Sequence, residues 1–194
     1  MTRGAERNKP IVRFAVFFEA GICLFAGFLG WLLGVPTLSR IHPTWTSLLS
    51  GILAAGPLLL AMWWCSNSSL KPLRTLMNQV EESLVPLFLG ASSATLLLIS
   101  VLAGLGEELL FRGVFQLGLT AWFGVPIALV ATSTLFGLAH LITPTYAVLA
   151  GLIGVYFGLL AVATDSLLAP IVAHALYDWV ALMYLVSPRR RKAT

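Results

Sequence analysis

Three groups of ionisable residues lie inside or beside apolar tracts in the second half of the chain. They are Glu107 and Glu108 with Arg112, then His140, then His174 with Asp178. An ionisable side chain at membrane depth costs about 2.5–3.5 kcal/mol on insertion scales. Residues kept at that cost are candidates for a functional site by default.

The first group has the spacing Glu-Glu-x-x-x-Arg. Glu108 precedes Arg112 by four residues, so the two share a helix face in the favourable order. Their pairing offsets much of the cost of burying either charge. Glu107 is rotated by about 100° from Glu108, and an unpaired carboxylate facing a dry cavity is a credible general base. The alternative is a structural ion pair with a spare glutamate at a helix end.

The two histidines have different local settings. His140 shares a helix face with Phe136, four residues earlier, and a single histidine near a helix end is more often a core or interfacial residue. His174 precedes Asp178 by four residues inside an apolar segment. The aspartate can select the tautomer and orientation of the imidazole. A His–Asp pair in such a segment is expensive to keep without a use.

Together, Glu107, His140 and His174 offer one carboxylate and two imidazoles from three segments, which suits two chemistries. In the first, the three residues bind a divalent metal such as zinc, which acidifies a water. In the second, Glu107 and His140 hold and deprotonate the water directly, and His174 with Asp178 stabilises the oxyanion. Both hydrolyse an amide or an ester, and the spacing leaves both open.

The elements that position these residues must be membrane helices. The chain has 194 residues, of which 58% are hydrophobic and 10% are charged. Soluble domains carry about 25% charged residues, and disordered chains are poor in apolar residues. No basic stripe alternates with aromatic residues, which argues against nucleic acid as a partner. We therefore predict an all-α, polytopic bundle of about six transmembrane helices, forming a single domain over residues 1–194, with a polar cavity inside the membrane.

Six spans are expected from the apolar tracts. They are 14–33, 48–65, one within 84–123, 125–141, 146–163 and 168–186. The 40-residue tract 84–123 would make a straight helix of about 60 Å, about twice the hydrocarbon thickness. It must therefore break or kink, and Gly104 and Gly106 are the natural break points. Gly124 and Pro126 end it. The more polar segment 67–83 is predicted to be an amphipathic helix or loop at the membrane surface.

Basic residues at both ends of the chain predict its orientation. They are Arg3, Arg7, Lys9 and Arg13 at the start, and Arg189, Arg190, Arg191 and Lys192 at the end. The positive-inside rule places both termini in the cytoplasm, in agreement with an even number of spans. Within the first span, Glu19 is interpreted as a structural residue that pairs with Arg13 or reaches the interface. Gly154 and Gly158 form a G-x-x-x-G motif, which favours close helix packing.

The three motifs, in this order, resemble those of the CPBP family of intramembrane proteases. The family contains the CAAX prenyl proteases and the bacterial Abi or bacteriocin-processing proteins, and the likeness covers about 84–186. It implies Glu107 as catalytic base, His140 as a water-binding residue, His174 and Asp178 as oxyanion stabilisers, and Glu108 with Arg112 as a supporting pair. Eukaryotic-type members tend to have Asn at position 178. Since an ionised Asp is a poor oxyanion donor, Asp178 is expected to orient His174 or to stay protonated.

The resemblance implies an intramembrane endopeptidase of a bacterial cell membrane that uses the metal-free mechanism. Its partner would be a membrane-anchored protein or peptide substrate in the lipid bilayer: a C-terminal sorting tail, a leader peptide or a lipidated C-terminus. One alternative is a non-catalytic binding or immunity protein on the same scaffold. Another is a small transporter or proton relay that uses Glu19, Glu107 and His174. The relay is disfavoured because the polar cluster occupies only the second half of the chain.

Overall fold

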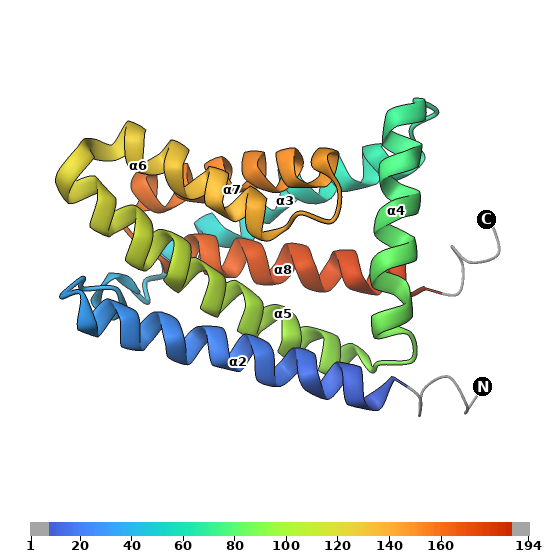
Figure 1. Ribbon diagram of the computed structural model, residues 1–194, viewed down its shortest axis with the longest axis horizontal. Coiled ribbons are helices and arrows are strands. Elements are labelled where there is room, and N and C mark those ends of the chain that lie inside the picture. The colour runs from blue at the N-terminus through green and yellow to red at the C-terminus, as the bar shows by residue number, and fades with distance from the viewer. Residues whose placement is uncertain (1–7, 188–194) are drawn as a thin grey trace.

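The computed structural model describes residues 8–187, and these residues form helices joined by short connections, without a strand (Figure 1). The helices are α2 (Lys9–Leu32), η1 (Leu38–Arg40), α3 (Trp45–Asn67), α4 (Lys71–Phe88), α5 (Ser93–Glu108), η2 (Leu109–Gln116), α6 (Leu117–Ala139), α7 (Pro144–Thr164) and α8 (Leu168–Leu185). The predicted all-α class is confirmed.

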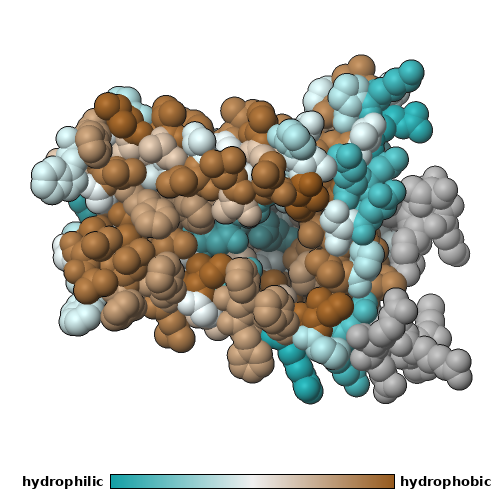
Figure 2. Space-filling model, in the orientation of Figure 1, coloured by the Kyte–Doolittle hydropathy of each residue, from teal (hydrophilic) through white to brown (hydrophobic). Residues whose placement is uncertain are grey.

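Five helical stretches of the described residues are long and apolar enough to cross a membrane: α2, α3, Ser93–Ala139, α7 and α8. Ser93–Ala139 is interrupted at Gly124, whose φ of 77° and ψ of 165° are not helical, and the chain turns back within α6 (Figure 1). Glycine adopts a positive φ without the steric cost of a side chain. Counting the two arms of this stretch separately gives the predicted number of about six. Apolar side chains cover most of the face in Figure 2, as expected for contact with lipid.

The predicted break at Gly104 and Gly106 is wrong. The chain continues through both glycines as α5 and then as η2, which is a π-helix. A Cβ atom at Gly104 would lie 2.9 Å from the carbonyl oxygen of Ile171 in α8, and one at Gly106 would lie 3.0 Å from the backbone nitrogen of Cys23 in α2. These glycines therefore allow close approach of two neighbouring helices. The apolar tract is instead interrupted at two other places. The chain is not helical at residues 89–92, between α4 and α5, and it turns at Gly124.

Helix α4 contains most of the segment that was predicted to be amphipathic. It lies across one end of the bundle, steeply inclined to the long helices (Figure 1). It buries Leu76, Met77 and Val80, while hydrophilic side chains gather along it (Figure 2). The Asn8 side chain donates to the carbonyl oxygens of Pro86 (2.8 Å) and Leu89 (3.0 Å), which ties the end of α4 to the start of α2.

The start of α2 and the end of α8 lie at the same end of the bundle as α4 (Figure 1). This arrangement agrees with the predicted even number of passes, and the cytoplasmic placement of this end stays a prediction. Of the basic residues that carried it, Lys9 and Arg13 belong to α2. The others lie outside the described residues; they are Arg3, Arg7, Arg189, Arg190, Arg191 and Lys192.

Candidate active site

Glu108 is the centre of a fully buried network. Its Oε1 atom lies 3.0 Å from Nη1 of Arg112 and 2.8 Å from Nδ1 of His174. The Arg112 guanidinium also donates through Nη2 to the carbonyl oxygen of Gly154 at 2.8 Å. Its carbon Cζ lies 4.5 Å from the centre of the Phe136 ring, within cation–π range. The predicted Glu108–Arg112 pair thus forms, and it joins the α5–η2 region to α7 and α8.

The G-x-x-x-G motif of α7 accommodates this network through close packing. A Cβ atom at Gly154 would lie 3.2 Å from Cα of Ser133 and 3.3 Å from Nη2 of Arg112. One turn further on, the carbonyl oxygen of Gly158 accepts a hydrogen bond of 3.1 Å from Nε2 of Gln116. Arg112 and Gln116 both belong to η2, and π-helical segments occur frequently at functional sites. The predicted close packing is confirmed, with the additional feature that the glycine carbonyls accept hydrogen bonds from η2.

Glu107, in contrast, contacts a single described polar group. Its Oε2 atom lies 3.5 Å from Nε2 of His140 and makes no hydrogen bond. The other ring nitrogen of His140, Nδ1, lies 2.8 Å from the carbonyl oxygen of Phe136. We assign the proton to Nδ1 because a carbonyl oxygen only accepts. In that tautomer the lone pair of Nε2 faces Glu107. His140 follows the last residue of α6, and burial lowers the pKa of its imidazole, which favours this neutral form.

His174 is held between two carboxylates. Its Nδ1 faces Glu108, and its Nε2 lies 3.4 Å from Oδ2 of Asp178, the residue one turn later in α8. The Phe157 ring stacks on the imidazole with 5.0 Å between ring centres. The expected contact between His174 and Asp178 therefore forms. The contact between His174 and Glu108 joins two motifs that were analysed separately.

The structure brings the predicted site residues to one cavity of about 510 Å³. Glu107, His140, His174 and Asp178 all line it, whereas Glu108 and Arg112 lie behind its wall. Most of the remaining wall is apolar and comes from α3, α4 and α7, including Leu58, Met62, Leu76, Met77, Val80 and Ile153. Figure 2 shows a hydrophilic patch in a hollow within the otherwise apolar face. Helix α4 closes part of the cavity with the same side chains that it buries.

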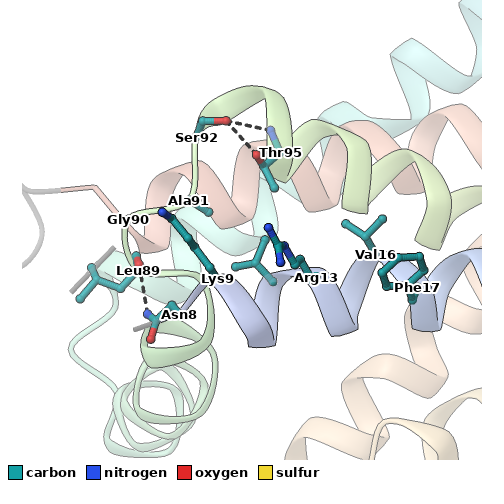
Figure 3. A pocket seen from close by; sticks show the side chains of 11 residues that line it. Asn8, Lys9, Arg13, Val16, Phe17, Leu89, Gly90, Ala91, Ser92 and Thr95 are labelled. Carbon is teal, nitrogen blue, oxygen red and sulfur yellow. Dashed lines mark hydrogen bonds between the residues drawn. The ribbon is translucent and has the colours of Figure 1, made fainter. Parts of the chain in front are cut away.

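Glu19 is a cavity residue that the sequence analysis interpreted differently. It lines the same cavity, and its Oε2 atom is buried without a hydrogen-bond partner. The expected pairing with Arg13 is wrong, because six helical residues rotate the two side chains by about 240° onto different faces. Arg13 instead lies in a second pocket, formed by the starts of α2 and α5 with Lys9, Ser92 and Thr95 (Figure 3). The signal that could have identified Glu19 was its acidity inside a span.

The arrangement does not fit the metal-binding alternative. A histidine ligand needs one ring nitrogen with a free lone pair, and both ring nitrogens of His174 face carboxylate oxygens. Among residues 8–187, no group of three or more His, Cys, Asp or Glu side chains has the geometry to hold a metal ion. Without His174, the predicted ligand set keeps Glu107 and His140, which is fewer than the three protein ligands typical of catalytic zinc sites.

A family model matches residues 89–180 of the chain; its description is type II CAAX prenyl endopeptidase Rce1-like. Comparisons with curated proteins and with solved structures found no match. The matched residues include Glu107, Glu108, Arg112, His140, His174 and Asp178. The match supports the resemblance noted in the sequence. Glu19 lies outside the matched residues.

Proposed function

We propose that the protein cleaves a membrane-anchored substrate with water activated by Glu107 and His140, and the match of residues 89–180 to the model of Rce1-like type II CAAX prenyl endopeptidases supports this proposal. One observation carries the proposal: Glu107 and His140 face each other across 3.5 Å in a largely apolar cavity. Neither is neutralised by Lys or Arg among residues 8–187, because no such residue in this range lines that cavity.

The first step is proton abstraction from a water that contacts both residues. His140 accepts one water hydrogen at Nε2, because its Nδ1 proton is bonded to the Phe136 carbonyl oxygen. Glu107 takes the other proton as the water oxygen bonds to the substrate carbonyl carbon. The carbon–nitrogen bond then breaks, and Glu107 returns the proton to the leaving amine. The water is consumed, and Glu107 ends in its starting state.

His174 is the donor that we assign to the developing oxyanion. Its Nδ1 contact with Glu108 and its stacking on Phe157 fix the ring plane. The longer contact of 3.4 Å between Nε2 and Asp178 is the one that a stronger acceptor can replace. Donors that are oriented before the reaction stabilise the charge without further rearrangement. Before the substrate binds, Asp178 orients the imidazole through this contact, which is the role that we propose for an acid at this position.

The position of the cavity favours a particular part of the substrate. Helix α4 contributes part of the cavity lining, and α4 lies at the end of the bundle where α2 starts and α8 ends (Figure 1). A substrate helix must unwind before attack, because its carbonyl oxygens are bonded within the helix. Unwinding is easiest near a helix end, so we propose cleavage near one end of the hydrophobic segment. A sorting tail, a leader peptide and a lipidated C-terminus all present such an end.

The test is the cleavage of co-expressed candidate substrates by Glu107→Gln and His140→Ala. Loss of a positioned general base reduces the rate by about 10²–10⁴-fold, and we expect E107Q to fall in this range. Glu82→Gln is the matched control, since Glu82 is exposed on α4 and does not line the cavity. Unchanged processing by an E107Q variant that accumulates normally would contradict the hydrolase and favour a binding or immunity protein.

A proton relay is the second candidate, because Glu19 supplies a polar cavity residue from the first half of the chain. This observation removes the objection that only the second half contributes to the cluster. Direct measurement of proton flux in liposomes separates the candidates. A relay predicts flux that E19Q and E107Q both abolish, whereas the protease predicts no flux above that of empty liposomes.

A further inference from the structure

Glu19 differs from the other acids of the cavity in lacking a partner. Glu107 contacts His140, and Asp178 contacts His174. The Oε2 atom of Glu19 is shielded from solvent and has no hydrogen-bond partner in the described structure. A carboxylate removed from water without a partner is costly. A positively charged group bound next to Glu19 would remove that cost.

The close contact between α2 and α5 holds Glu19 in this place. Gly106, next to Glu107, packs against Cys23, and a Cβ atom there would lie 3.0 Å from both the backbone nitrogen and the Sγ atom of Cys23. The Cys23 thiol donates to the carbonyl oxygen of Leu102 at 3.3 Å. Cys23 follows Glu19 by one helical turn, so both lie on the same side of α2. The contact that seats α2 on α5 thus directs Glu19 into the cavity that Glu107 lines.

The charges around the cavity indicate what Glu19 accepts. Within the part of the chain that the structure describes, the lining contains the three carboxyl groups of Glu19, Glu107 and Asp178, two imidazoles, and no Lys or Arg. Arg112 is already bonded to Glu108 and Gly154, and Arg13 lies in the separate pocket (Figure 3). The described side chains therefore provide no basic group for Glu19.

We propose that Glu19 is a specificity-determining residue that binds a positively charged side chain, lysine or arginine, close to the scissile bond of the substrate. This inference rests on the proposed function, because it assumes that a substrate is cleaved in this cavity. It concerns a residue outside the segment that matches the family model. The apolar stem of such a side chain packs against the aliphatic wall while its charged head reaches Glu19. A neutral side chain of similar length would leave Glu19 unpaired.

The first experiment measures binding in the Glu107→Gln background, so that bound peptide is not cleaved. The probes are fluorescent 20-residue Leu/Ala transmembrane peptides with a single lysine stepped through the last turn at either end. Each has a norleucine twin. In lipid nanodiscs, we expect at least one lysine peptide to bind tenfold or more tightly than its twin. We expect this preference to fall below twofold in E107Q/E19Q and to persist in the control E107Q/E82Q.

Two binding results would overturn the inference. One is equal binding of every lysine peptide and its twin by E107Q. The other is a lysine preference that survives Glu19→Gln. Binding of the norleucine twins should not change between E107Q and E107Q/E19Q, which shows that the substituted protein is folded.

The second experiment measures cleavage of the preferred peptide pair by proteins that retain Glu107. We expect E19Q to lower kcat/KM for the lysine peptide at least tenfold and for its twin less than twofold. Glu19→Lys should favour a peptide with glutamate at that position. Equal losses on both peptides would show that Glu19 acts in folding or chemistry, and so overturn the inference. A Glu19-dependent lysine preference in binding, without cleavage by the wild type, would refute the proposed function alone.

Discussion

Glu107 and Glu108 are neighbours in α5, yet they belong to two different regions of the molecule. Glu108 is completely buried, and one of its oxygens lies within 3.0 Å of both Arg112 and His174. Glu107 faces the cavity with its side chain 14% exposed, and it contacts His140 at 3.5 Å. One step along a helix therefore separates a carboxylate that is held by two partners through its Oε1 atom from one that makes no hydrogen bond and is free to react.

The difference shows how the fold keeps a reactive carboxylate in place. The Glu108 region joins four helical elements through Arg112, His174 and the carbonyl of Gly154. Because Glu107 shares a backbone with this region, its position is fixed without bonds to its own carboxylate. When packing and hydrogen bonds of neighbouring residues fix the position of a side chain, its reacting atoms need no hydrogen bonds of their own. Stability and proposed chemistry are thus divided between adjacent residues.

The largest expected effect comes from breaking the Glu108 region. Arg112→Leu leaves the buried Glu108 with His174 as its one remaining hydrogen-bond partner among the described residues, and removing one partner of a buried ion pair costs about 3–5 kcal/mol. We expect this loss in the free energy of unfolding, measured in mixed micelles. Glu107→Gln should change the same quantity by less than about 1 kcal/mol, because the contact that it alters is long and partly exposed.

A double substitution provides the control for this prediction. Arg112→Leu with Glu108→Leu removes both charges, and apolar replacement of a buried pair is often neutral or stabilising. It should recover much of the loss, even though the contacts with His174 and Gly154 are gone. Equal destabilisation by E107Q and R112L would show that the two regions do not differ in the way described.

Contacts within one helix could be predicted from the sequence, whereas contacts between helices could not. The pairs Glu108–Arg112 and His174–Asp178 each span one turn, so the spacing alone brings them together. The contact between Glu108 and His174 depends on how α8 packs against α5. Glu19 was misinterpreted for the same reason: its surroundings come from helices that are distant in sequence.

The helical class and the approximate number of spans could be predicted because a long apolar run has few alternatives in a membrane. The end of the apolar tract at Gly124 was also predicted and is confirmed, whereas the continuous path of the chain through Gly104 and Gly106 could not be predicted. Glycine is typical of a break and equally of a close helix contact, and Gly104 and Gly106 make contacts while Gly124 makes the break. Only the positions of α2 and α8 distinguish these roles.

Gly154→Ala also alters the Glu108 region, and we expect it to have a smaller effect on the free energy of unfolding. The new methyl group would lie 3.2–3.3 Å from the Ser133 backbone and the Arg112 guanidinium. Overpacking a tight site typically costs about 1–3 kcal/mol, which mixed-micelle unfolding would detect. Gly21→Ala is the matched control, because nothing lies within 4 Å of its added Cβ atom. Loss of stability in G21A equal to that in G154A would point to helix propensity or lipid contact instead.

The smallest expected effect is on the cleavage rate when metal ions are removed, and it concerns the Glu107 region. His174 faces Glu108 and Asp178 with its two ring nitrogens, so in this arrangement it belongs to the Glu108 region and offers Glu107 and His140 no free nitrogen as a third metal ligand. The proposed mechanism therefore predicts cleavage rates that stay within about twofold after chelation, since it assigns no step to a metal ion. The measurement is a titration of purified protein in nanodiscs with a membrane-impermeant chelator and with a permeant one. A loss of cleavage that zinc restores would contradict this prediction. His174 would then have to leave Glu108 and bind the metal together with Glu107, so the two regions would not be separate.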